Sequence, residues 1–85
     1  MSKTTTHITM YVTAHCSLCE KALEQLFEID IPSGFKVTTK DISVSAALVE
    51  EFGERIPVLQ CDGLLLEAPF DKDELEAWIS SLPRF

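Results

Sequence analysis

The 85-residue sequence predicts a single α/β domain, a four-stranded mixed sheet flanked by three helices in the order β-α-β-α-β-β-α. Three kinds of pattern predict this class. Alternating apolar and polar residues indicate strands, apolar residues three and four positions apart indicate helices, and an Asp-Gly pair indicates a hairpin. One domain covering residues 1–85 is expected at this length, with a polar and flexible start at residues 1–6.

The first part of the chain predicts a strand, a helix and a second strand. Apolar and polar residues alternate over His7–Val12, which is typical of a half-buried strand. A helix follows, and the turn residues at 32–34 end it. Alternation returns over Phe35–Ile42 and predicts a strand parallel to the first. The expected apolar face of the helix consists of Cys19, Ala22, Leu23, Leu26 and Phe27.

The next part predicts a helix and a hairpin. Ser43 is the expected N-cap of the helix, and Gly53 ends it. Ile56–Cys61 predicts a strand, and Asp62-Gly63 joins it to Leu64–Leu66 through a two-residue turn. We expect Leu64–Leu66 to be a buried strand, unless it forms an edge that meets a partner. The residues expected to face inward from the helix are Val44, Ala47, Leu48 and Phe52.

The last helix has the clearest start in the chain. Asp71 is its expected N-cap, and Glu74 completes a capping box three residues later. Phe70 precedes the cap and is expected to pack on Leu75. Pro83 lies just past the expected end of the helix. Its buried stripe consists of Leu75, Trp78, Ile79 and Leu82.

Composition excludes several functional classes. The 7 Lys and Arg against 14 Asp and Glu give a formal charge of 7 − 14 = −7, which disfavours binding to nucleic acid. No apolar stretch approaches the roughly 18 residues of a membrane-spanning helix. The start of the chain also lacks the apolar core of a secretion signal. We therefore expect a cytoplasmic protein that binds neither nucleic acid nor membrane.

Two of the three cysteines, Cys16 and Cys19, lie where the first strand gives way to the first helix. The unpaired N–H groups and the dipole at a helix N-terminus stabilise a thiolate at Cys16. Cys19 follows one turn later on the same side of the helix, at a Cβ separation of about 5–6 Å. We therefore predict a redox-active pair in which Cys16 is the exposed nucleophile and Cys19 the more buried resolving thiol.

A zinc site is the competing interpretation, because one C-x-x-C is half of such a site. His7, His15 and Cys61 are the candidates for further ligands, but none forms a second close pair. We therefore favour redox chemistry and expect no metal. His15 either tunes Cys16 or is a solvated loop residue, and the second alternative is favoured. Cys61 is expected to be a small buried hydrophobe without a catalytic role.

These features resemble the glutaredoxin branch of the thioredoxin fold, and within it the small glutaredoxin-like proteins with a C-x-L-C motif. The resemblance covers residues 7–82. It implies a cis peptide at Ile56-Pro57, beside the cysteine pair, where the free backbone groups of Ile56 bind an extended substrate segment. Ile56 and Pro57 are therefore the predicted substrate-binding residues. The matching motifs are Tyr11 in the first strand, Cys16-Ser17-Leu18-Cys19-Glu20, Arg55-Ile56-Pro57-Val58-Leu59 and Pro69-Phe70-Asp71.

The sequence also departs from the usual glutaredoxin pattern. Ser17 and Leu18 replace Pro-Tyr between the cysteines, and Thr13 replaces a Lys three residues before the first cysteine. Pro69 and Phe70 replace a Gly-Gly pair that helps to hold glutathione in that family. These departures predict a weak glutathione site.

The expected function is that of a small thiol–disulfide oxidoreductase acting on a protein or small-molecule disulfide. Glutathione or a dedicated reductase is the candidate electron donor, and no tightly bound cofactor is expected. The chain is expected to be a monomer. Two alternatives stay open: a non-catalytic thioredoxin-fold binding module, and a metal or iron–sulfur carrier that uses Cys16 with external ligands.

Overall fold

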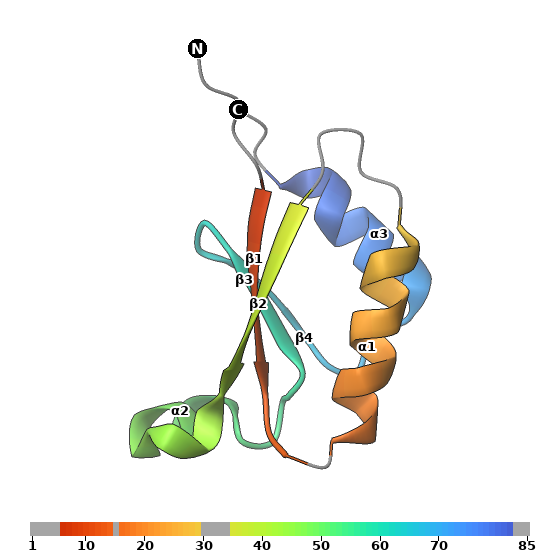
Figure 1. The fold of residues 1–85 in the computed structure, drawn as a ribbon. Helices are drawn as coiled ribbons and strands as arrows, with labels where there is room; N and C mark the ends of the chain where they lie inside the picture. The colour runs from red at the N-terminus through yellow and green to blue at the C-terminus, as the bar shows by residue number, and fades with distance from the viewer. Residues whose placement is uncertain (1–5, 15, 30–34, 83–85) are drawn as a thin grey trace.

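The computed structural model describes residues 6–14, 16–29 and 35–82. The elements follow the predicted order and form one four-stranded sheet with the strand order β2-β1-β3-β4 (Figure 1). A short 3-10 helix, η1, precedes the second α-helix. The strands are β1 (Thr6–Val12), β2 (Phe35–Asp41), β3 (Val58–Cys61) and β4 (Leu64–Glu67), and the helices are α1 (Ser17–Glu28), η1 (Ile42–Val44), α2 (Ala46–Phe52) and α3 (Lys72–Ser81).

The sheet is mixed, as predicted. β1 pairs in parallel with β2 and antiparallel with β3, and β3 pairs antiparallel with β4. Asp62 and Gly63 join β3 to β4 with φ angles of 50° and 83°. Positive φ at both central positions is typical of the type I′ two-residue turn, and Asp and Gly tolerate it, so the hairpin prediction is confirmed.

The main core lies on the sheet face that α1 and α3 cover (Figure 1). Alternation along β1 directs Ile8 and Met10 to this face, where both are fully buried. Leu26 of α1 and Leu75 of α3 meet them and are also fully buried. Each such side chain contributes about 1.5–3 kcal/mol through burial, so this cluster fixes both helices on the sheet. Its other buried members are Ala22, Leu59, Cys61, Trp78, Ile79 and Leu82.

A smaller cluster lies on the opposite face, at the end of the sheet that α2 covers (Figure 1). Tyr11 follows Met10 in β1 and therefore points to this other face. Its ring stacks on Phe52 with the ring centroids 4.7 Å apart, and its hydroxyl donates to Oε1 of Gln60 at 2.7 Å. Ile42 and Val58 complete the buried part of this cluster. Tyr11 thus anchors α2 to the sheet.

The start of α2 differs from the prediction. The Asp41 carboxylate accepts the backbone N–H of Ser43 at 2.9 Å and begins η1, and the Ser45 hydroxyl accepts the N–H of Leu48 at 3.3 Å and caps α2. Ser45, not Ser43, is therefore the N-cap of the helix. This extra turn changes which side chains face the sheet. Val44 is 74% exposed and Ala47 is also exposed, so the prediction that both face inward is wrong.

The strand predicted at Leu64–Leu66 is present as β4, but the prediction that it is buried is wrong for Leu64 and Leu65. β4 is an edge strand, and Leu64 and Leu65 are 40% and 41% exposed. Phe27, which was expected on the buried face of α1, is 63% exposed and stacks instead on Phe35, with the ring centroids 5.7 Å apart. The spacing of apolar residues in the sequence predicted that these side chains are buried. They lie instead at the edge of the sheet and at the margin of α1, where solvent reaches them.

The start of α3 agrees with the prediction. The Asp71 carboxylate accepts the backbone N–H of Glu74 at 2.7 Å, and Oε1 of Glu74 accepts the N–H of Asp71 at 3.0 Å. Phe70 packs against the main core, in which Leu75 is buried. Lys72 forms an ion pair of 3.3 Å with Glu28, which ties the start of α3 to the end of α1. The predictions on His15, on the turn at 32–34 and on Pro83 lie outside the described residues.

Among the described residues, no helix has both the length and the apolar character that crossing a bilayer requires.

Candidate functional site

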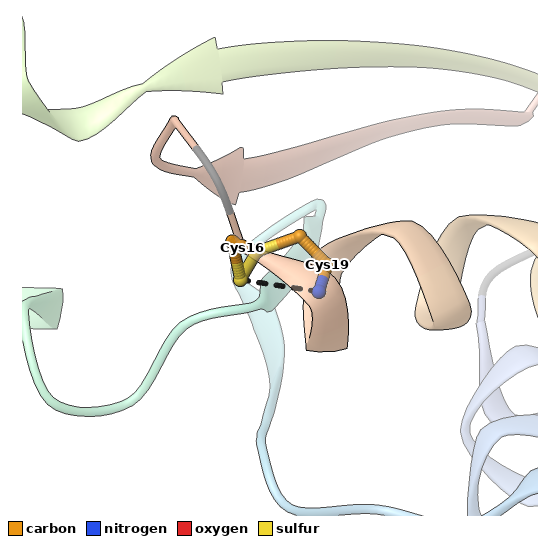
Figure 2. The surroundings of a disulfide bond; sticks show 2 residues. All are labelled: Cys16 and Cys19. Carbon is orange, nitrogen blue, oxygen red and sulfur yellow. Dashed lines mark hydrogen bonds between the residues drawn. A yellow bond between two sulfur atoms is a disulfide. The ribbon is translucent and has the colours of Figure 1, made fainter.

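The Cys16–Cys19 pair forms a disulfide at the N-terminal end of α1 (Figure 2). Cys16 is the N-cap residue, with the extended backbone angles φ −102° and ψ 101°, and Cys19 lies in the first turn of the helix. Their Cα atoms are 5.2 Å apart, within the range that a disulfide requires. One helical turn therefore brings the two sulfur atoms within bonding distance.

The Cys16 sulfur also acts as the helix cap. Its Sγ accepts the backbone N–H of Cys19 at 3.1 Å, drawn as the dashed line in Figure 2. That N–H is among those that have no partner within the helix, and Ser or Asp fills this role in most helices. A thiolate at this atom would receive the same hydrogen bond and the partial positive charge of the helix end. The site is therefore arranged to stabilise negative charge on Cys16.

The two cysteines differ in access to solvent. Cys16 is half-buried, whereas Cys19 is 5% exposed and begins the buried side of α1. Cys16 is thus less exposed than predicted, but the predicted order, with Cys19 the more buried of the two, agrees with these positions. Which of the two performs the chemical attack stays a prediction.

The loop before β3 carries the two predicted substrate-binding residues. The Ile56-Pro57 peptide is cis, as the resemblance implied, and so is Ala68-Pro69. The backbone N–H of Ala68 is shared between the carbonyl oxygens of Arg55 and Pro57, at 3.1 Å each. Within the described part of the chain, the N–H and C=O of Ile56, between these two tethered residues, have no backbone partner. The loop thus presents one backbone donor and one backbone acceptor, both on Ile56.

A groove of about 200 Å³ connects the start of α1 with this loop. Leu18, which lies between the two cysteines, and Pro57 both line it, and Figure 2 shows the segment that leads into β3 passing the disulfide. Sequence reasoning related only Pro69 and Phe70 of the remaining residues to a site, as the replacement of the glutathione-holding Gly-Gly pair, because elements far apart in the chain contribute the others. These remaining residues are Lys21, Ala22, Gln25, Ala68, Pro69, Phe70 and Asp71.

A second hollow of about 170 Å³ lies between α1 and the sheet. Cys16, Cys19 and Glu20 line it from α1, and Met10 and Val12 line it from β1. Leu23, Thr13 and Thr39 complete its lining. Residues of α1 therefore line two depressions, the groove beside Pro57 and this hollow against the sheet, and the cysteines themselves line the second.

The other candidate ligands lie apart from the pair. Cys61 is at the hairpin end of β3, three residues or about 10 Å along the strand from Val58, and is 6% exposed. Burial raises the pKa of its thiol, and the charge of Asp62 adds to this. His7 bonds through Nε2 to the Thr38 hydroxyl at 2.8 Å. Within the described residues, no three His, Cys, Asp or Glu side chains gather as metal ligands.

Comparison with known proteins identifies the family. The family described as "Glutaredoxin-like domain (DUF836)" matches residues 7–80, so the chain belongs to this glutaredoxin-like family of the thioredoxin fold. Mycobacterial relatives named "Uncharacterized protein Rv0508" (Mycobacterium tuberculosis) and "Uncharacterized protein Mb0520" (Mycobacterium bovis) are each 36% identical over 61 residues. These matches cover 66% of this chain and 63% of each relative.

Solved structures agree on the fold. The crystal structure of target protein XcR50 from X. campestris is 33% identical, with a TM-score of 0.75, and the match covers 89% of this chain and 99% of XcR50. A protein from Nitrosomonas europea, NE0084, is described as a dimeric thioredoxin-like protein. It is 22% identical, with a TM-score of 0.54, over 86% of this chain and 98% of its own. The latter likeness concerns the fold alone.

Proposed function

We propose that this chain is a small thiol–disulfide oxidoreductase in which Cys16 attacks the substrate disulfide and Cys19 releases the product. The observation that carries this proposal is the position of the Cys16 sulfur as the N-cap of α1, where it accepts the Cys19 N–H at 3.1 Å. A helix N-terminus favours the thiolate, which is the nucleophilic form of cysteine. The resolving thiol lies one turn away, and the N–H and C=O of Ile56 have no backbone partner among the described residues.

The reaction balances as a transfer of two electrons. The Cys16 thiolate attacks one sulfur of the substrate disulfide, the substrate S–S bond breaks, and one thiolate leaves and takes up a proton. Cys19 loses its proton and attacks the Cys16 sulfur, which frees the second substrate thiol and closes the Cys16–Cys19 disulfide. Glutathione or a dedicated reductase is the proposed donor that returns the pair to the dithiol.

The remaining parts of the proposal concern the setting of the protein. We propose a cytoplasmic monomer with no tightly bound cofactor and no nucleic-acid or membrane partner. The excess of acidic side chains supports the absence of nucleic-acid binding, because phosphate backbones attract basic surfaces. A reducing cytoplasm would hold the Cys16–Cys19 pair as the dithiol that the reaction needs.

Trapping of the mixed disulfide tests the mechanism. We expect Cys19→Ser to accumulate an adduct with a model disulfide, because no thiol remains to break it. Cys16→Ser should accumulate at least about tenfold less, because Cys19 is buried and lacks the cap position. Cys61→Ser is the matched control and should behave like the wild type. Non-reducing electrophoresis, repeated after reduction, measures the adduct.

Two results would count against an enzyme. Equal trapping by the Cys16→Ser and Cys19→Ser variants would remove the distinction between attacking and resolving thiols. An absence of adduct in every variant would favour a non-catalytic binding module. Metal analysis of the purified reduced protein tests the third alternative, a carrier that holds a metal or cluster through Cys16.

A further inference from the structure

The groove beside Pro57 has few polar groups left for a ligand at its α3 end. The Asp71 carboxylate lines the groove but already accepts the Glu74 N–H at 2.7 Å. The Asp71 N–H is also occupied, because it donates to Oε1 of Glu74 at 3.0 Å. A charged ligand group at this end would have to compete with the capping box. Lys21 and Gln25 of α1 are the other polar residues of the lining, and the remaining walls are apolar: Leu18, Ala22, Pro57, Ala68, Pro69 and Phe70.

The size of the groove matches one side chain. Pockets that enclose whole small-molecule ligands have volumes of about 300–1,000 Å³, whereas an apolar cavity of about 150 Å³ holds one benzene molecule. The groove, at about 200 Å³, falls between these and suits one aromatic or branched aliphatic group. Its charged members, Lys21 and Asp71, have opposite signs, so the lining carries no net charge that would attract a carboxylate or an amine.

We propose that this groove binds an apolar side chain of a peptide substrate, within two residues of the cysteine that Cys16 attacks. This inference rests on the proposed function and specifies its substrate class as protein disulfides with an apolar neighbour. Leu18 connects the groove to the cysteine pair, and Pro57 connects it to the unpaired backbone N–H and C=O of Ile56. A substrate strand paired at Ile56 places its side chains alternately toward and away from the protein, which brings one of them to the groove.

A single-turnover assay with synthetic peptides tests this inference. Each peptide carries one cysteine in a mixed disulfide with mercaptoethanol, and Leu, Ser or Asp occupies one of the four positions within two residues of it. The protein is reduced with dithiothreitol, which is then removed, so each turnover yields two thiols and one Cys16–Cys19 disulfide. At one or more of these four positions, we expect the peptide with Leu to be reduced about tenfold faster than the peptide with Ser, measured at low peptide concentration. A factor of about ten is the lower end of the selectivity that one apolar contact in a pocket provides.

Two variants locate the preference in the groove. Leu18→Ser removes an apolar wall at a residue that is 59% exposed, and we expect the Leu-over-Ser ratio to fall by at least half. Leu65→Ser is the matched control, because Leu65 is an exposed leucine on β4 outside the groove lining, and it should keep the full ratio.

The outcomes separate this inference from the proposed function. Equal rates for the Leu, Ser and Asp peptides would overturn the groove assignment and leave the oxidoreductase intact. An unchanged ratio in Leu18→Ser, or an equal loss in Leu65→Ser, would also overturn it. Failure to reduce any peptide, together with failure to reduce 5,5′-dithiobis(nitrobenzoate), would reject the proposed function and this inference with it.

Discussion

At the scale of single residues, the three cysteines have three different environments. Cys16 caps α1, Cys19 lies on the buried side of that helix, and Cys61 is buried in the main core near the hairpin. The sequence predicted this division, because Cys19 begins an apolar stripe while Cys61 lies inside a strand. The hydrogen bond from the Cys19 N–H to Cys16 had no sequence signal beyond the position of Cys16 before the helix.

Cys61 should make stability depend on pH in the alkaline range. In the oxidised protein Cys61 is the remaining thiol, and burial raises its pKa above the ordinary value of 9.0, with Asp62 adding to the effect. The unfolded chain therefore loses this proton at a lower pH than the folded chain. The stabilising contribution is complete below about pH 9 and is lost as the pH rises through the raised pKa.

Urea unfolding of the oxidised wild type and of Cys61→Ala, at neutral pH and at about pH 10, measures this contribution. We expect the free energy of unfolding of the wild type to fall more between the two conditions than that of Cys61→Ala. An equal fall in both proteins would show that folding does not raise the pKa of the Cys61 thiol.

At the scale of elements, the sequence predicted the start of a helix correctly where a complete capping box marks it. Asp71 and Glu74 bond each other's backbone N–H groups and fix where α3 begins. The N-cap of α2 was predicted at Ser43, two residues too early. The Asp41 carboxylate accepts the backbone N–H of Ser43 and caps η1, so α2 begins only after Ser45. Ser43 and Ser45 are both acceptable caps, and the sequence alone did not distinguish them.

Loss of the α3 cap should therefore destabilise the protein measurably. Asp71→Ala removes the acceptor of the Glu74 N–H, and we expect a loss of about 1 kcal/mol in the free energy of unfolding. Glu76→Ala, at an exposed position inside the same helix, is the matched control and should change stability by less than about 0.5 kcal/mol. Chemical unfolding of both variants provides the comparison, and equal losses would contradict the role of the cap.

At the scale of the whole molecule, the order of elements was enough to predict the sheet. Two strands around a helix gave the parallel pair, and Asp62-Gly63 gave the hairpin. Solvent exposure was harder to predict than strand order. Leu64 and Leu65 belong to an apolar run and were expected to be buried, but they are exposed because β4 has no neighbour on its outer side within the described sheet. The groove was not predicted either, because α1, the loop before β3 and the start of α3 meet only in the folded chain.

The overall charge and the groove together predict poor use of glutathione. Glutathione is an anion, the chain carries a charge of −7, and the capping box occupies Asp71. We expect turnover in a coupled glutathione-reductase assay at least about tenfold below that of a C-P-Y-C glutaredoxin, and we expect added salt to reduce the deficit by screening repulsion.

Thr13→Lys offers a direct test of the charge, because Thr13 lines the hollow that reaches Cys16. This variant should raise glutathione turnover, whereas Ser80→Lys, which adds the same charge on the exposed side of α3, should raise it less. Turnover by the wild type at the rate of a C-P-Y-C glutaredoxin would show that these departures have no effect.

The cysteine pair and the loop at Ile56, the two parts of the candidate site, are anchored in different hydrophobic clusters. α1, which carries the cysteines, is anchored in the main core, whereas Ile56 packs against the small cluster of Ile42, Phe52 and Val58. Small clusters open more readily than the main core in amide hydrogen exchange. Detachment of α2 would therefore loosen the loop before β3 while α1 stayed folded on the sheet. Backbone amides of α2 should then exchange with deuterium faster than those of β1, so the surface that receives a substrate strand can adapt to it while the reactive sulfur atoms keep their position.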